Sequence, residues 1–220
     1  MVKRMAIQFT EIYSRAMALL KSPVLSRLQD NDLYSFCLTM NQYLKVATTF
    51  YNPNLATEER LSHVAEQEDD VVRFQGDGST SEFVITGENA PSENSVLKVC
   101  INDRIIYKYT YNYETQTLTL DDDIPLTSDV VSLFWLNDGS FTLATNEDAT
   151  LLSIALCWAW AIQTQNNILD IDRQPNDSDF KLHAEGTTLN AKVDWVKHFE
   201  EMYKRELSKA DWRPFFRKRG

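Results

Sequence analysis

The sequence is poor in the residues that mark disulfide-rich, collagen-like or low-complexity chains. Its 220 residues include 3 cysteines, 6 glycines and 6 prolines. So little glycine and proline excludes a linker-rich chain. Cys37, Cys100 and Cys157 are far apart and form no CxxC pair, so we expect buried free thiols in place of a disulfide framework. No signal-peptide core follows the basic first residues before Thr10.

An excess of positive charge is lacking as well. The formal net charge is −10, which argues against a protein that binds nucleic acid over its whole surface. The acidity is concentrated in residues 54–148, which hold 19 acidic and 5 basic side chains, whereas residues 149–220 hold 10 and 11. We therefore expect the middle third to be a separate structural unit that repels DNA.

No apolar run reaches the length of about 20 residues that a bilayer span needs. The most apolar stretch, 146–166, has Thr145 or Asn146 as a possible N-cap and acidic residues in its first turn. From Leu151 to Ile162 almost every residue is apolar. A helix that is apolar on nearly all sides must be surrounded by other elements. We expect this stretch to be the central helix of a helical core.

Other helices are indicated by apolar residues at three-four spacing. They are expected at residues 10–21, from a cap at Asp30 or Asn31 to Phe50, and at 188–209, with a short helix at 57–67.

Between Val71 and Leu136 the pattern changes to short stretches rich in Val, Ile, Thr, Tyr and Phe, separated by turn residues. This spacing is typical of a β-sandwich or barrel. Strands are expected at 71–75, 81–86, 94–102, 104–111, 115–120 and 129–136. Asn102-Asp103 is expected to form a tight turn.

Together these elements predict an α+β fold. It consists of a four-helix bundle core with an antiparallel β-sandwich or barrel-like module inserted between helices 2 and 3. Residues 1–68 and 140–210 would form the discontinuous bundle, 70–138 the inserted module and 211–220 a C-terminal docking tail.

No residue pattern points to catalysis, a metal or a cofactor, and we expect no enzyme. His63, His183 and His198 stand alone without HExxH. Residues 170–178 place oxygens at alternate positions but lack the glycine and glutamate of an EF-hand. Asp121–Asp123 is expected to be a charged loop tip.

Four tyrosines recur at spacing two: Tyr107, Tyr109, Tyr111 and Tyr113. On one strand they would share a face, which could stack on sugars or on a partner protein. A half-buried face of a sandwich is the favoured interpretation. A turn is expected near Tyr111-Asn112.

The strongest functional signal is an aromatic-basic segment, residues 211–220. It contains Trp212, Arg213, Phe215, Phe216, Arg217, Lys218 and Arg219. Pro214 prevents a straight helix from continuing through it. Exposed aromatics are costly in a monomer and typical of interface anchors, so docking into another chain is favoured over folding back on the bundle.

Two parts of the chain resemble bacteriophage structural proteins. Residues 71–136, with FQGDGSTSEFVIT, SVLKVCINDRIIY and a last strand after a Pro-containing loop, are similar to a β module found in many phage virion proteins. The helical frame, DNDLYSFCLTMNQYLKVATTF, NEDATLLSIALCWAWAIQTQN and the last helix with its tail, resembles head–tail connector, or adaptor, proteins.

The resemblance implies a structural virion protein that is assembled in the host cytoplasm. It would form a homo-oligomeric ring of about twelve copies under the portal protein and join the DNA-filled head to the tail. The segment 212–219 would clamp the portal. Other neck or tail proteins would be partners, DNA would be only cargo in the channel, and no membrane would be bound. The alternative is a virion protein that binds a receptor or glycan through the Tyr-rich β module.

Overall fold

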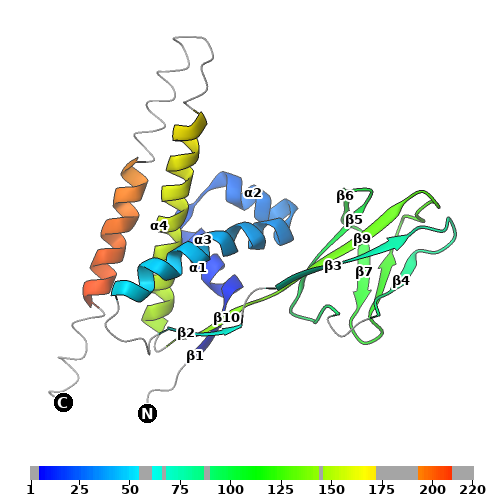
Figure 1. The fold of residues 1–220 in the computed structure, drawn as a ribbon, viewed down its shortest axis with the longest axis horizontal. Helices are drawn as coiled ribbons and strands as arrows, with labels where there is room; N and C mark the ends of the chain where they lie inside the picture. The colour runs from blue at the N-terminus through cyan, green and yellow to red at the C-terminus, as the bar shows by residue number, and fades with distance from the viewer. Residues whose placement is uncertain are drawn as a thin grey trace, which may run out of the picture. The chain divides into compact units, whose positions relative to one another are not determined.

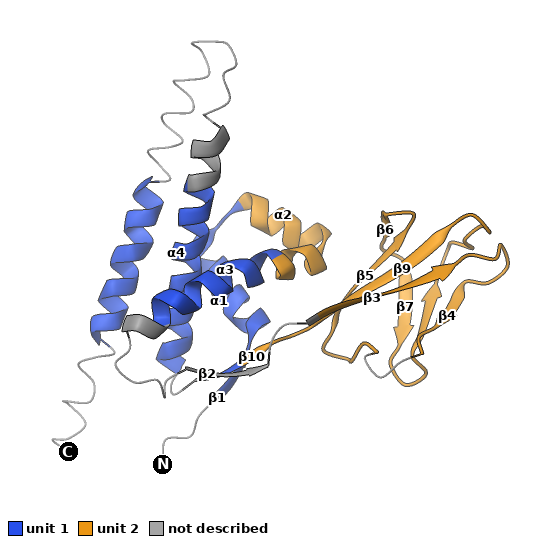
Figure 2. Ribbon diagram, viewed as in Figure 1, with its two compact units in different colours: residues 1–22, 39–63, 141–220 blue, residues 23–38, 64–140 orange. Residues whose placement is uncertain are grey.

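The computed structural model describes residues 5–54, 61–65, 68–86, 90–143, 146–171 and 193–209. These residues form helices and antiparallel sheets, which confirms the predicted α+β class (Figure 1). Two compact units divide the chain (Figure 2). Unit 1 comprises Met1–Ser22, Thr39–His63 and Phe141–Gly220, and unit 2 comprises Pro23–Leu38 and Val64–Ser140.

Unit 1 is mainly helical. It contains α1 (Phe9–Leu20), the part of α3 (Leu33–Asn54) from Thr39 onward, α4 (Asn146–Ile171) and a helix over residues 193–209. The first three confirm helices that the sequence predicts. Three short strands form a sheet in the order β1-β10-β2, with β1 at Met5–Gln8, β10 at Ser140–Leu143 and β2 at Leu61–Ala65.

Helix α4 is the buried centre of unit 1. From Leu151 to Ala161 every side chain is buried except that of Trp158, which is half-buried. Ser153, the polar residue in this run, donates its hydroxyl to the Ala149 carbonyl oxygen at 2.8 Å. Its hydrogen-bonding capacity is therefore used within the helix, and its burial carries no desolvation penalty for an unpaired donor.

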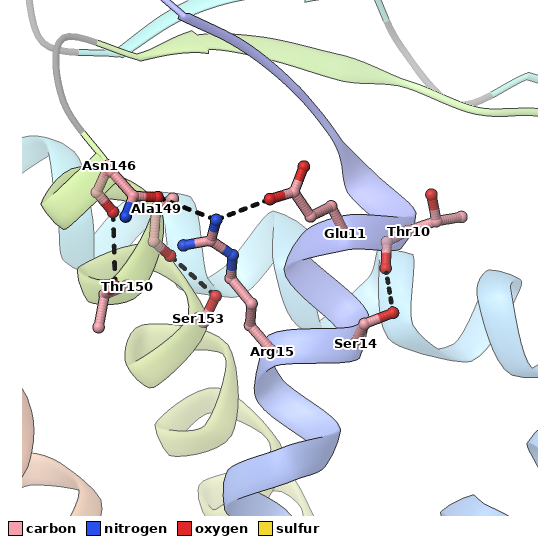
Figure 3. Close-up of polar contacts among 8 residues, drawn as sticks. All are labelled: Thr10, Glu11, Ser14, Arg15, Asn146, Ala149, Thr150 and Ser153. Carbon is pink, nitrogen blue, oxygen red and sulfur yellow. Dashed lines mark hydrogen bonds and ion pairs between the residues drawn. The ribbon is translucent and has the colours of Figure 1, made fainter.

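Helix α1 packs against α4 in unit 1. The Cys157 thiol lies 3.5 Å from the Ala16 carbonyl oxygen, which shows how closely the two backbones approach. At the start of α4, Arg15 donates to Glu11 Oε1 at 2.6 Å and to Asn146 Oδ1 at 2.9 Å (Figure 3). One guanidinium thus joins the surface of α1 to the first residue of α4.

The helix over residues 193–209 is fastened to α3 and α4 by aromatic side chains. Tyr203 is buried; its hydroxyl donates to the Phe50 carbonyl oxygen at 3.1 Å and its ring lies 5.7 Å from that of Trp158. Phe50 and Trp158 are themselves 4.5 Å apart, centroid to centroid. This cluster fixes the helix on the core of unit 1.

Unit 2 holds two antiparallel sheets that share one core. The first has the order β3-β9-β5-β6 and the second β4-β8-β7. Their bounds are β3 Glu68–Gln75, β4 Glu82–Val84, β5 Val96–Ile101, β6 Arg104–Ile106, β7 Tyr109–Asn112, β8 Thr117–Leu120 and β9 Val130–Asn137. Phe83 and Leu118 of the second sheet pack with Val99, Leu133 and Trp135 of the first.

Residues 23–38 also belong to unit 2. They form α2 (Pro23–Asn31) and the first turns of α3. Asp32 caps α3 by accepting the Ser35 backbone N–H at 3.0 Å, and its other carboxylate oxygen accepts Lys98 of β5 at 2.6 Å. Burial raises the pKa of Asp32, but the hydrogen bonds from Lys98 and Ser35 outweigh it, so the net pKa lies below its usual value.

Three predictions about elements were wrong. The short helix expected at 57–67 is not formed, because Leu61–Ala65 is strand β2; residues 55–60 lie outside the described part of the chain. Helix α2 occupies residues between the helix expected at 10–21 and the cap expected at Asp30 or Asn31, where the sequence predicts no element. Residues 104–111, expected as one strand, are split into β6 and β7 by Tyr107-Lys108.

Candidate functional site

The β5–β6 hairpin supplies one wall of the candidate site. Its two-residue turn is Asn102-Asp103, as the sequence predicts, and both residues have positive φ, 49° and 65°. Such a turn matches the twist of the paired strands and is favoured by Asn and Asp. Oδ1 of the Asn102 side chain accepts the N–H of Val130, the first residue of β9, at 2.9 Å.

The loop from Asp121 to Asp129 supplies the opposite wall, and Asp129 holds it in shape. One carboxylate oxygen of Asp129 accepts the Asn102 amide at 2.7 Å, and the other accepts the Leu126 N–H at 2.8 Å. The Gln75 amide donates to the carbonyl oxygens of Thr127 and Asp129, at 2.7 and 3.0 Å. The loop is therefore preorganised by a hydrogen bond within it and by hydrogen bonds from Asn102 and Gln75.

Gly76 is required where this loop meets the end of β3. A Cβ atom at position 76 would lie 2.2 Å from the Leu126 carbonyl oxygen and 2.9 Å from Pro125. The neighbouring Gly78 donates its N–H to the Pro125 carbonyl oxygen at 2.9 Å. The two glycines of the GDGST sequence thus let the chain after β3 pass close to the backbone of this loop, and a bend follows at residues 78–79.

Between these two walls lies a groove of about 770 Å³. We call it the β6–β7 groove, because the connection between those strands forms its third side. Its lining residues are Ile101, Asn102, Arg104, Ile105, Ile106, Tyr107, Lys108, Asp122, Asp123, Ile124, Pro125 and Asp129.

Large apolar side chains are exposed at the groove. Tyr107 is 70% exposed and Ile124 58%, and both line it; Leu126, two residues further along the same loop, is 63% exposed. Side chains of this size usually find a partner, and a cluster of them beside a groove marks an interaction surface.

The other tyrosines of the run do not reach the groove. Tyr109 and Tyr111, on β7, are half-buried and pack on the core of unit 2. The Tyr111 hydroxyl donates to Gln116 at 2.5 Å, and its ring lies 4.9 Å from that of Tyr113. The half-burial that the favoured interpretation expects is confirmed for these two residues, while Tyr107 lies outside β7. The turn expected near Tyr111-Asn112 comes later, at residues 113–116.

The charges that line the groove are unequal in number. Two basic residues, Arg104 and Lys108, and three acidic ones, Asp122, Asp123 and Asp129, line it. Lys108 forms an ion pair with Asp122, and the hydrogen bond in this pair raises the pKa of the lysine. Both side chains are well exposed, so the pair contributes little to stability.

The partner-binding residues expected from the sequence, Trp212, Arg213, Phe215, Phe216, Arg217, Lys218 and Arg219, lie outside the described residues. So do residues 172–178 of the stretch that lacks the glycine and glutamate of an EF-hand. In the part of the chain that the structure describes, no group of three or more His, Cys, Asp or Glu side chains is placed to hold a metal ion.

The three cysteines are buried and free, as expected. Burial raises the pKa of Cys37 to about 12 and raises the pKa of Cys157 and Cys100 as well. Their thiols are therefore protonated at neutral pH and poorly nucleophilic.

Sequence reasoning missed the groove itself, with Arg104, Lys108 and Ile124. The available signal was weak: Tyr107 belonged to the tyrosine run and Asp121–Asp123 was noted as a charged loop tip, but nothing in the sequence placed the two together. Their proximity depends on the pairing of β7 with β8, which brings Lys108 opposite Asp121, where its carbonyl oxygen accepts the Asp121 N–H at 3.3 Å.

Comparison with protein-family models, with curated proteins and with solved structures finds no match to this chain. In the described residues, α4 and the other helices fall short of the apolar length that a membrane crossing requires.

Proposed function

We propose that this chain is a structural virion protein, a head–tail connector (adaptor) that forms a ring under the portal and joins the DNA-filled head to the tail. In this proposal the helices of unit 1 act as a four-helix core, and the two sheets of unit 2 are a module inserted into it. The chain acts by assembly rather than catalysis, and DNA passes its ring only as cargo.

One observation carries the proposal. The helix over residues 193–209, which precedes the aromatic-basic segment, is fixed to α3 and α4 by the buried Tyr203. A docking segment gains affinity when its base is held in place, because less freedom is lost on binding. The buried α4 supports the same interpretation: its apolar surface is used within unit 1 to hold this base.

Binding to purified portal protein tests the proposal. Full-length chain and a variant with Trp212→Ala, Phe215→Ala and Phe216→Ala are compared by size-exclusion chromatography with portal. The unaltered chain is expected to co-elute and the variant is not, because aromatic anchors dominate such interfaces. Equal portal binding by the full-length chain and the variant would refute the proposed clamp.

The contribution of charge has a matched control. Arg217→Gln, Lys218→Gln and Arg219→Gln remove three positive charges from the segment. Lys197→Gln, Lys204→Gln and Arg205→Gln remove three from the exposed surface of the preceding helix. Only the first set is expected to weaken portal binding, and more so at low salt.

A second candidate function, binding of a receptor or glycan, keeps one observation in its favour: the exposed ring of Tyr107 in the β6–β7 groove. An aromatic ring beside charged groups can stack on a sugar. A glycan array with specific signals that disappear in Tyr107→Ala would support it. Tyr109→Ala is unsuitable for this test, since Tyr109 packs on the core.

A further inference from the structure

The β6–β7 groove combines exposed apolar side chains with an acidic rim. Tyr107 and Ile124 line the groove, Leu126 lies two residues beyond Ile124, and each is more than half exposed. The loop that carries Ile124 and Leu126 is held by the hydrogen bonds of Asp129. Aliphatic side chains offer little to a saccharide, whose hydroxyls need polar partners. Apolar groups surrounded by charge are typical of a surface that binds protein.

The rim carries more negative than positive charge. Asp122, Asp123 and Asp129 line the groove, and Asp103 and Asp121 flank lining residues in the sequence. Against them, the lining contains two basic residues, and one of these, Lys108, is paired with Asp122. In the described residues neither Asp103 nor Asp123 has an ion-pair partner.

Within the same chain, residues 211–220 have the complementary chemistry. This segment contains three aromatic and four basic residues and one acidic residue. Its aromatic rings would cover the apolar side chains of the groove, and its arginine and lysine side chains would pair with the aspartates of the rim. We propose that the β6–β7 groove of one copy binds the aromatic-basic segment 211–220 of a second copy.

This contact would be heterologous, because the groove and the segment are different surfaces. Heterologous contacts form closed rings when the rotation between copies closes, and open filaments when it does not. The inference rests on the proposed function and deepens it by naming the contact that joins copies before they bind portal.

The same segment is the proposed portal contact, so the two interactions exclude one another within one copy. Copies free of portal would hold the segment in a neighbour's groove, where its aromatic rings are covered. Portal would then compete for it. The groove and the segment thus have separable roles: the groove serves self-association alone, and the segment serves both contacts.

Self-association of the full chain is measured by native mass spectrometry and analytical ultracentrifugation. A groove variant carries Tyr107→Ser, Ile124→Ser and Asp123→Lys, and a segment variant carries Trp212→Ala, Phe215→Ala and Phe216→Ala. Each is expected to self-associate at least about tenfold more weakly than the unaltered chain. Val84→Ser is the control, since Val84 is 57% exposed but lies on β4 outside the groove.

Mixing the two variants gives the sharpest result. The groove variant retains an intact segment and the segment variant an intact groove, so together they are expected to form one-to-one heterodimers and nothing larger. Heterodimers would be absent if the segment bound the groove of its own chain, and the proposal would be overturned. It is also overturned if the unaltered chain stays monomeric, or if the groove variant self-associates normally.

Portal binding separates failure of this inference from failure of the proposed function. The groove variant is expected to bind portal at least as tightly as the unaltered chain, because no groove competes for its segment, while the segment variant does not bind. If the segment variant loses portal binding but self-associates normally, the groove contact is refuted and the clamp stands. If it binds portal normally but loses self-association, the clamp is refuted and the groove contact stands. Far-UV circular dichroism confirms that each variant is folded.

Discussion

Helix α4 and the β6–β7 groove use apolar side chains in opposite ways. In α4 nearly every apolar group from Leu151 to Ala161 is enclosed by unit 1 itself. At the groove, three large apolar side chains are left exposed although the loop that carries two of them is tightly hydrogen-bonded. A loop without such hydrogen bonds exposes apolar side chains because nothing holds them against the core. A loop held by hydrogen bonds that still exposes apolar side chains leaves them available to a partner.

If α4 is the core, an ionised group at its centre should have the largest effect of any single substitution. Leu152 is completely buried. We expect Leu152→Asp to lower the free energy of unfolding by about 4 kcal/mol or more, because an unpaired charge is buried. Thr150→Asp places the same side chain on the exposed side of the same helix. In urea titrations followed by circular dichroism, equal stability of the two variants would contradict the central role of α4.

The rigidity of the groove wall is tested at Gly76. We expect Gly76→Ala to cost about 3 kcal/mol, since the new methyl group would collide with the Leu126 carbonyl oxygen and the backbone must shift. Gly78→Ala is the matched control. Its Cβ would meet only Thr127 Cγ2, at 3.9 Å, and its φ of +75° costs about 1 kcal/mol. If Gly78→Ala lost more thermal stability than Gly76→Ala, the loop would not pack closely against position 76.

A smaller effect is expected at the polar link between α3 and β5. Asp32→Ala removes both the cap of α3 and the partner of Lys98, and should cost about 1–2 kcal/mol. Asp32→Asn keeps a capping oxygen but loses the charge, and should cost less.

The effect of Asp32 should depend on pH. The pKa of Asp32 is lower in the folded chain than in the unfolded chain, where it is about 4. The ionised carboxylate therefore stabilises the fold at pH values above the unfolded-state pKa, and this stabilisation is lost as the pH falls through the folded-state pKa. The difference in urea midpoint between the unaltered chain and Asp32→Asn should therefore shrink from pH 7 to pH 3. A difference that stays constant would show that the carboxylate charge contributes nothing.

The smallest effect is expected at the groove surface. Tyr107→Ala should change the free energy of unfolding by less than about 0.5 kcal/mol, because the ring packs against little of its own chain. Tyr109→Ala, two residues later, should cost about 2 kcal/mol because its ring packs on the core of unit 2. Equal losses in differential scanning fluorimetry would mean that Tyr107 is part of the fold and is not reserved for a partner.

Elements with strong local signals were predictable from the sequence. The apolar length of α4, the three-four spacing of α1 and α3, and the Asn102-Asp103 turn all depend on residues close together in the chain. The structure extends α4 to Ile171, beyond the expected stretch 146–166.

Elements that depend on distant partners were missed. Leu61–Ala65 is strand β2 because it joins the sheet of β1 and β10, and a short stretch after Thr57 and two glutamates resembles a helix when considered alone. Pro23 follows the helix expected at 10–21, and a proline in that place usually marks the end of a helix. Proline also suits the first position of a new helix, and α2 begins there. The β6–β7 groove was missed for the same reason, since its walls come from segments that are separate in the sequence.

The chain enters and leaves unit 2 more than once, because Pro23–Leu38 groups with the strands of Val64–Ser140. A recombination event that exchanged residues 64–140 alone would therefore leave behind residues 23–38, which belong to the same compact unit. Tyr34, whose ring lies 5.9 Å from that of Phe134, and Asp32, which binds Lys98, would lose their contacts. Any functional swap of these strands must carry a matching change in residues 23–38, so the two segments should be inherited together.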